Sequence, residues 1–341
     1  MHKPNFLNKL APRMWLLIAA ALGLAVALPV RVLQQLFGAQ IDPTFGVENF
    51  TGFWVDSGHI TVILLYIFMA LPLVASVALA VMMRNTVAVD LQRKPRKAEG
   101  YISLVAALFV LISAVLVFLQ TMAAMLAARE VGEAAFGAGV LAAIFEGIFG
   151  LGVVAFFVNL GLVNLFPTGK IYLYRVLTLM PLLWVITRLL GYFSRTISYL
   201  RVSDLLINIA AAALLLVFFM AMAQVITGVN AEKKTWRLAA VGLPAAVILL
   251  VAFFPRLVAA GFGDVFPSQD AVLDLADLGV ALFVGVFMFT RLRTKEPEEI
   301  AAEEPVETDE IQSEEHLPVD VIPEQEEVVP VFQEQVITEE V

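Results

Sequence analysis

Long apolar runs separated by short polar segments are the main pattern along this chain of 341 residues. A helix needs about 20 apolar residues to cross the hydrocarbon core of a membrane. Eight runs meet that length, so we predict an all-α integral membrane protein, a bundle of eight transmembrane helices within a transmembrane domain at residues 1–293. The predicted spans are 14–34, 60–83, 101–127, 138–160, 172–191, 204–228, 237–256 and 272–290.

Composition supports this pattern and separates off the end of the chain. Hydrophobic residues make up 60% of the sequence, whereas soluble domains have about 45–50%. Residues 1–295 hold 22 Lys and Arg against 14 Asp and Glu, whereas residues 296–341 hold 17 acids and no Lys or Arg. Such an acidic segment cannot bury enough apolar surface to offset its chain entropy. We therefore predict a disordered acidic cytoplasmic tail at residues 294–341.

The distribution of basic residues predicts the orientation of the spans. With the N-terminus in the cytoplasm, 16 Lys and Arg lie inside and 6 outside, and all eight lysines lie inside. Cytoplasmic loops are enriched in these residues. The first run has a basic start and the small-residue string 25–27, as in a signal peptide, but it continues to Leu33. We favour an uncleaved first span and a cell-membrane protein with both termini in the cytoplasm.

Ionisable groups gather near the predicted outer ends of the spans, and buried charges in spans are costly and often functional. Asp270, Asp274 and Asp277 share one helical face. Two interpretations stay open: a structural clamp of ion pairs, or an outward-facing polar pocket for a small ion, an anionic head group or a proton. Glu146 lies about 12 Å down its span, and we predict that it pairs with Arg188. The candidate pocket residues are Glu146, Arg188, Arg195, Arg201, Asp204, Asn208, Asp274 and Asp277.

The loop at residues 41–59 is the longest on the predicted outer side. Its turn-forming pairs and five large apolar side chains predict an ordered lid that rests on the helix ends or the headgroup layer. Its acidic side chains would lie near Arg195 and Arg201 of the cationic outer loop at 192–203. The candidate lid residues are Asp42, Trp54, Asp56 and His59.

Motifs for chemistry are scarce in this sequence. The absence of cysteine removes disulfides and thiolate sites, and three histidines cannot form a metal cluster. We predict no metal, no cofactor and no catalytic residues, so enzymatic activity is not expected. The basic string at 93–97 is the positive-inside signal and a contact for anionic lipid, and nothing else points to nucleic acid.

Two resemblances bear on function. The strings at 41–44, 51–53 and 195–204 resemble a group of uncharacterised bacterial multi-pass membrane proteins, which implies the eight-span architecture and no activity. An insertion between Thr44 and Gly52 departs from that pattern. Separately, Ser57-Gly58-His59 and Ser194-Arg195 resemble motifs of the undecaprenyl-pyrophosphate phosphatase family, which implies a lipid-phosphate phosphatase as a remote alternative.

Two main hypotheses of function follow. The first is a non-enzymatic scaffold in the lipid bilayer that recruits other membrane proteins through its outer loop, or a basic cytoplasmic partner through its acidic tail. The second is a carrier or sensor of a small ion or solute that uses the outer polar pocket. Solute-dependent thermal stabilisation separates them.

Overall fold

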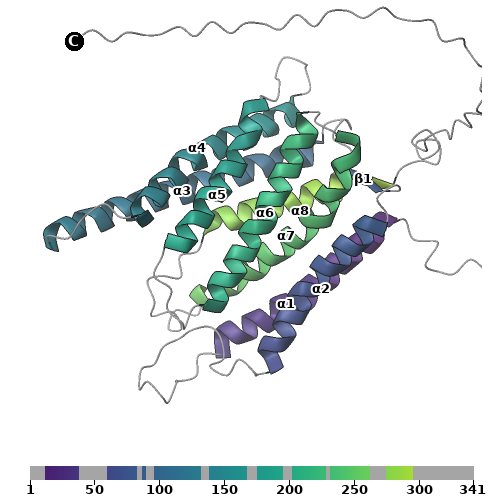
Figure 1. Ribbon diagram of the computed structural model, residues 1–341, viewed down its shortest axis with the longest axis horizontal. Helices are drawn as coiled ribbons and strands as arrows, with labels where there is room; N and C mark the ends of the chain where they lie inside the picture. The colour runs from purple at the N-terminus through teal and green to yellow at the C-terminus, as the bar shows by residue number, and fades with distance from the viewer. Residues whose placement is uncertain are drawn as a thin grey trace, which may run out of the picture. The chain divides into compact units, whose positions relative to one another are not determined.

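The computed structural model describes residues 12–37, 60–82, 87–89, 96–131, 138–166, 175–194, 202–227, 231–261 and 274–294. All of them belong to one compact unit, Met1–Ala301. The elements shown in Figure 1 are α1 (Pro12–Phe37), α2 (Ile60–Met82), β1 (Val87–Val89), α3 (Lys97–Val131), α4 (Ala138–Leu165), the 3₁₀ helix η2 (Arg175–Leu179), α5 (Met180–Ser194), α6 (Val202–Ile226), α7 (Ala231–Gly261), α8 (Leu275–Arg291) and β2 (Leu292–Thr294). The predicted lid lies outside these residues, and so does the predicted acidic tail except for its first residue, Thr294, which belongs to β2.

Seven helices among the described residues are long and apolar enough to cross a membrane, one fewer than predicted. The difference is α8, which has 17 residues and is therefore about 26 Å long, shorter than a hydrocarbon core of about 30 Å. It is short because the Asp274 side chain caps its start and the chain turns into β2 after Arg291. The fold is thus a helical bundle compatible with membrane insertion.

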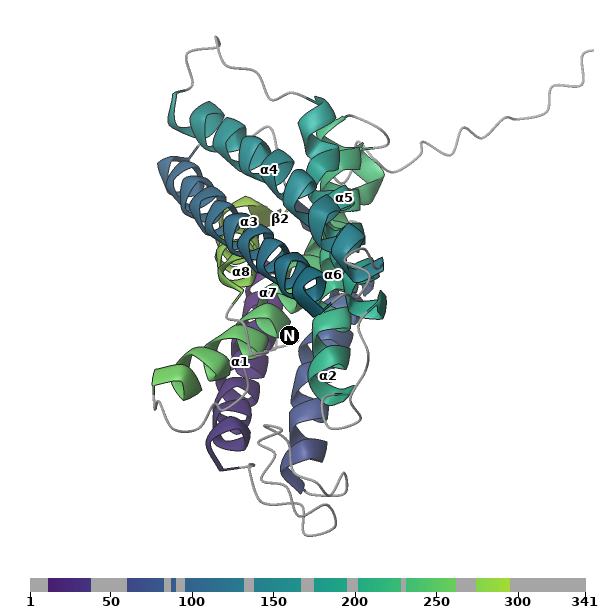
Figure 2. The same cartoon turned by 90° about the vertical axis from the view of Figure 1, so that its left-hand side faces the viewer.

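Helix α7 is the most enclosed of these seven helices. In its apolar stretch 83% of the window is buried, against 22–44% in the other six. It contacts α1 and α2 as well as α6 and α8. Helices α3 to α8 form a closed circuit, because each contacts the next along the chain and α8 returns to α3. Figures 1 and 2 both show α3 running beside α4.

An aromatic cluster joins three helices of this circuit in the core. Phe157 of α4 meets Phe283 of α8 edge to face, with ring centroids 4.8 Å apart. Phe287, one turn further along α8, meets Phe218 of α6 at 6.1 Å. Such pairs contribute about 0.5–1.5 kcal/mol beyond the area that they bury. The cluster packs the middle of α8 against the bundle.

Close contacts between helices occur at glycines, but not where the sequence favoured them. Small residues recur every four positions at Ala135, Gly139, Ala143 and Gly147, a sequence pattern typical of close helix packing, yet nothing lies within 4 Å of a β-carbon built on Gly147. The close approach is further along α4, where a β-carbon on Gly161 would lie 3.1 Å from the Gly100 carbonyl oxygen of α3. Small residues allow backbones to approach in this way. The tight α3–α4 crossing therefore lies near the start of α3 and the end of α4, outside that repeat.

A two-stranded antiparallel sheet is an addition to the predicted all-α fold. Val87 of β1 faces Thr294 of β2, and Val89 faces Leu292. The pairing lies between the segment after α2 and the residues directly after α8. It places β2 against a segment 200 residues earlier in the chain, which no local pattern predicts.

Candidate functional site

Arg188 of α5 is the centre of a buried polar cluster. Its Nη1 donates to Asp277 Oδ1 at 2.6 Å, and its Nη2 donates to Asp274 Oδ2, also at 2.6 Å. Nη2 also donates to the Tyr192 hydroxyl oxygen at 3.0 Å. The Arg188 side chain is only 7% exposed. One guanidinium therefore joins α5 to two carboxylates at the start of α8, and we call this set, with Glu146, the Arg188 cluster.

Glu146 of α4 completes the cluster. Its Oε1 lies 3.4 Å from Arg188 Nε, and its side chain is 16% exposed. The ion pair predicted between these two residues is therefore present. Because the Asp contacts are shorter, the two aspartates hold Arg188 more closely than Glu146 does, and Glu146 adds α4 to the helices that the cluster connects.

The start of α8 explains why two aspartates lie here. The Asp274 Oδ1 accepts from the Ala276 backbone N–H at 3.0 Å, which is an N-cap contact, and from Ser113 Oγ of α3 at 2.6 Å. Asp277 lies in the first turn of α8. Carboxylates are stabilised at a helix N-terminus because the backbone N–H groups there carry partial positive charge. The helix end and Arg188 thus stabilise the same two negative charges.

Aromatic rings shield the guanidinium. Trp184 and Tyr192 lie one turn before and one turn after Arg188, so all three share one face of α5. The guanidinium carbon is 4.8 Å from the Trp184 ring centroid and 5.9 Å from that of Tyr192. Both distances lie within the range of cation–π contacts, which strengthen when water is excluded. The α5 face is therefore built to hold one cation away from solvent.

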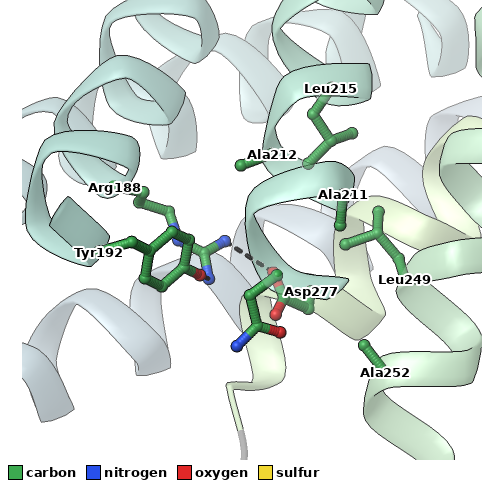
Figure 3. Close-up of a pocket in the computed structure, with 9 residues that line it drawn as sticks. Arg188, Tyr192, Ala211, Ala212, Leu215, Leu249, Ala252 and Asp277 are labelled. Carbon is green, nitrogen blue, oxygen red and sulfur yellow. Dashed lines mark hydrogen bonds and ion pairs between the residues drawn. The ribbon is translucent and has the colours of Figure 1, made fainter. Parts of the chain in front are cut away.

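A small cavity adjoins the cluster. Figure 3 shows Arg188 and Tyr192 of α5 facing Asp277 of α8 across it. The cavity has a volume of about 10 Å³, which is room for about one water. The lining is Arg188, Tyr192, Asn208, Ala211, Ala212, Leu215, Leu249, Ala252 and Asp277. In this conformation α5, α6 and α8 each contribute a polar group to the cavity, the α7 side is apolar, and the space is too small for an organic solute.

Asn208 extends the polar layer to α7, because its Oδ1 accepts from Arg256 Nη2 at 3.3 Å. The structure thus brings together five of the eight predicted pocket residues: Glu146, Arg188, Asn208, Asp274 and Asp277. Asp204 lies in α6, and the structure describes its backbone only. Outside the described residues lie Arg195, Arg201 and the four lid residues Asp42, Trp54, Asp56 and His59.

A second buried cluster was not predicted. Glu99 of α3 is 2% exposed, and its Oε2 accepts from Arg291 Nε at 2.7 Å and from Arg291 Nη2 at 2.5 Å. Its Oε1 accepts from Thr290 Oγ1 at 2.5 Å, and Arg291 Nη2 also donates to Asn164 Oδ1 at 3.2 Å. We call these four residues the Glu99 cluster. It joins α3, α4 and α8 at the opposite end of α8 from Asp274.

The sequence signal for this cluster was weak. Glu99 stands just before the predicted run 101–127 and directly after the basic string 93–97, and Arg291 was counted as a positive-inside residue. A lone acid beside an apolar run and amid basic residues is the one feature that could have marked it. To predict the cluster, one would also have had to identify its partner Arg291, which lies more than 190 positions away in the sequence.

Chemically, the Arg188 cluster combines one cationic group with three carboxylates. Arg188 offers a guanidinium to an anionic group, and Asp274 and Asp277 offer carboxylates to a cationic one. No group of three or more His, Cys, Asp or Glu placed to hold a metal ion occurs within the described ranges. Comparisons with family models, with curated proteins and with solved structures find no match to this chain.

Proposed function

We propose that this helical membrane protein is a carrier or sensor of a small charged solute or ion, with the Arg188 cluster and its cavity as the binding site. The observation that carries this proposal is a cavity between α5, α6, α7 and α8 with a guanidinium, a carboxylate, an amide and a phenol on its lining. Ligand sites in helical bundles combine apolar walls with a few placed polar groups in this way.

The energetics of buried charge favour a charged ligand. Removing one partner of a buried ion pair costs about 3–5 kcal/mol because the other charge is left without compensation. A ligand that separates Arg188 from Asp277 must therefore supply a replacement charge. A small anion could take the place of a carboxylate at Arg188, and a small cation could pair with Asp277. A neutral solute would restore neither contact.

A non-enzymatic scaffold that recruits partners, the first hypothesis from the sequence, becomes the second candidate. The observation that favours it is that the cavity has room for about one water, so the same contacts also suit a structural clamp. A scaffold would recruit membrane proteins through the loop 41–59 or a basic cytoplasmic partner through the tail 294–341, and both segments, apart from Thr294 in β2, lie outside the described residues. The lipid-phosphate phosphatase alternative has no support beyond its sequence strings.

We also propose eight spans in the cell membrane with both termini in the cytoplasm. A helix enclosed by protein can be shorter than the hydrocarbon core, and most of α8 is buried. Counting α8 as the last span returns the chain to the side on which it began. The Arg188 cluster then lies toward the outer face and the Glu99 cluster toward the cytoplasm, about 26 Å apart along α8.

Thermal unfolding of the full chain in detergent tests the proposed function. The purified protein, in a buffer of large organic ions, is titrated with sodium, potassium, acetate or glycine. We expect one probe to raise Tm saturably, because a ligand at 100 times its Kd stabilises the folded state by about 2.7 kcal/mol. The rise should vanish in Asp277→Asn and Arg188→Gln.

A matched control is Phe289→Leu, which changes an exposed apolar residue of α8 away from the site. It should keep the response of the wild type. If none of the four probes shifts Tm saturably, or if Asp277→Asn responds as the wild type does, the carrier or sensor proposal fails and the scaffold is favoured.

A further inference from the structure

We infer that α5 is a hinged gate over the cavity, with Arg188 as its latch and the junction of η2 and α5 as its hinge. The inference concerns how the site opens, and its relevance to a ligand rests on the proposed function. Three features of α5 carry it: a break in helix geometry at one end, packing against α4 that loosens toward the other end, and charged contacts at the loose end.

The hinge is at the start of α5. The span begins as the 3₁₀ helix Arg175–Leu179 and becomes α-helical at Met180. Pro181 follows at once and has no backbone N–H to donate. The Thr178 hydroxyl donates to the Arg175 carbonyl oxygen at 2.6 Å, which ties the 3₁₀ turn to itself. A 3₁₀ turn at a helix N-terminus is common, but here a proline follows it, so the junction lacks one backbone hydrogen bond that a continuous helix would have.

Packing between α4 and α5 loosens along α5. Near the hinge, a β-carbon on Gly152 would lie 2.7 Å from Met180 Sδ, so the methionine fills a notch in α4. One turn on, a β-carbon on Gly150 would lie 3.7 Å from Trp184 Nε1. Near the far end, a β-carbon on Gly191 would lie 3.9 Å from Ala142 Cβ. The base of α5 is therefore locked by shape, and its far half rests on ordinary contacts.

The charged contacts hold the loosely packed half. Arg188 reaches from α5 to Asp274 and Asp277 of α8 and to Glu146 of α4. α8 is fixed independently, because Ser113 of α3 donates to Asp274 and the Glu99 cluster holds its other end. Release of the Arg188 contacts would thus free α5 rather than α8.

The gate would open the cavity because α5 supplies one wall of it. Arg188 and Tyr192 come from α5, while the other seven lining residues come from α6, α7 and α8. Figure 3 shows these two side chains standing between the α5 ribbon and the cavity. A movement of the far half of α5 away from α8 would withdraw both and expose the remaining walls to water.

Cysteine accessibility tests the gate, because the chain has no cysteine of its own. Ala212→Cys places a single thiol on the cavity wall, where the residue is 6% exposed. Membrane vesicles carrying the full chain are treated with an impermeant methanethiosulfonate, and the rate of modification is measured. We expect slow modification with the latch intact and a rate about tenfold higher with Arg188→Lys, which corresponds to about 1.4 kcal/mol in the opening equilibrium. Lysine keeps the charge but lacks the planar fork that reaches two carboxylates.

The control and a second measurement keep the inference falsifiable. Phe289→Leu changes an exposed apolar residue of α8 and should leave the modification rate unchanged. Separately, Ala142→Cys with Gly191→Cys creates a pair whose β-carbons lie 3.9 Å apart, which suits a disulfide. Oxidation should cross-link this pair quickly in the closed gate and several-fold more slowly with Arg188→Lys.

Equal modification rates with and without the latch, or equal cross-linking rates, would overturn the gate. So would a Phe289→Leu rate as high as that of Arg188→Lys, because the increase would then not depend on the Arg188 contacts. None of these readouts uses a ligand. If α5 moves but no solute stabilises the protein, the gate is supported and the carrier or sensor proposal fails. If a solute stabilises the protein but the rates do not depend on Arg188, the gate fails and the carrier or sensor proposal is supported.

Discussion

Replacing Glu99 by glutamine should destabilise the protein more than any other single neutralisation in α3. The Glu99 Oε2 accepts two hydrogen bonds from Arg291, at 2.7 Å and 2.5 Å. A glutamine amide has only one oxygen. It can turn that oxygen to Thr290, which places its N–H₂ group against the guanidinium, or it can turn the oxygen to the guanidinium, which then faces a neutral acceptor instead of a carboxylate. Each hydrogen bond to a charged group contributes about 1.5–3 kcal/mol, and breaking a buried pair costs about 3–5 kcal/mol. We expect a loss in that range.

Equilibrium unfolding in mixed micelles of mild detergent and dodecyl sulfate measures this loss. Glu130→Gln is the matched control, because Glu130 lies in the same helix and is exposed; surface changes of this kind stay within about 0.5 kcal/mol. The double variant Glu99→Gln with Arg291→Gln should lose less than the sum of the two single losses, because it leaves no buried charge. A Glu99→Gln protein as stable as the Glu130→Gln control would refute the reasoning.

Three further predictions follow from other parts of the chain. A cysteine at Thr51 should react with an impermeant maleimide added outside cells, while one at Thr235 should not; the reverse pattern would invert the proposed topology. Gly161→Leu should reduce Tm in detergent strongly, because its β-carbon would lie 2.9 Å from Leu104 Cδ2, whereas Gly147→Leu should leave Tm nearly unchanged; equal Tm values would contradict the tight crossing. Backbone amides at 41–59 should exchange hydrogen more slowly than those of the acidic tail, and equal rates would rule out a lid.

The sequence was informative where a single helix carries the signal. Asp274 and Asp277 are close in sequence. Glu146 lies deep in its apolar run and Arg188 lies in the last turn of the next one, which was enough to predict that these two pair. The seven long spans follow from hydropathy in the same way. These features depend on membrane thickness and helix geometry, which act on each segment separately.

Features that depend on distant segments could not be predicted. The Glu99 pair needs the exact placement of α8 against α3, and the strand β1 needs residues directly after α8. The 3₁₀ start of the fifth span lies inside a continuous apolar run, and hydropathy does not distinguish one helix type from another. Pro181 marks the place, but the notch at Gly152 that receives Met180 depends on how α4 and α5 cross.

The position of α8 at the end of the described chain has a consequence for biosynthesis. Glu99 and Arg291 are 192 residues apart, and Arg188 and Asp277 are 89 apart. At about 5–20 residues per second, a ribosome takes roughly 10–40 s to progress from the first acid to its arginine. During that time the Glu99 carboxylate near the start of α3 and the Arg188 guanidinium in α5 lack the partners that α8 supplies, and an uncompensated charge within a span is costly. We therefore expect the nascent helices to remain beside the insertion machinery until α8 has been synthesised, and the bundle to assemble only after that.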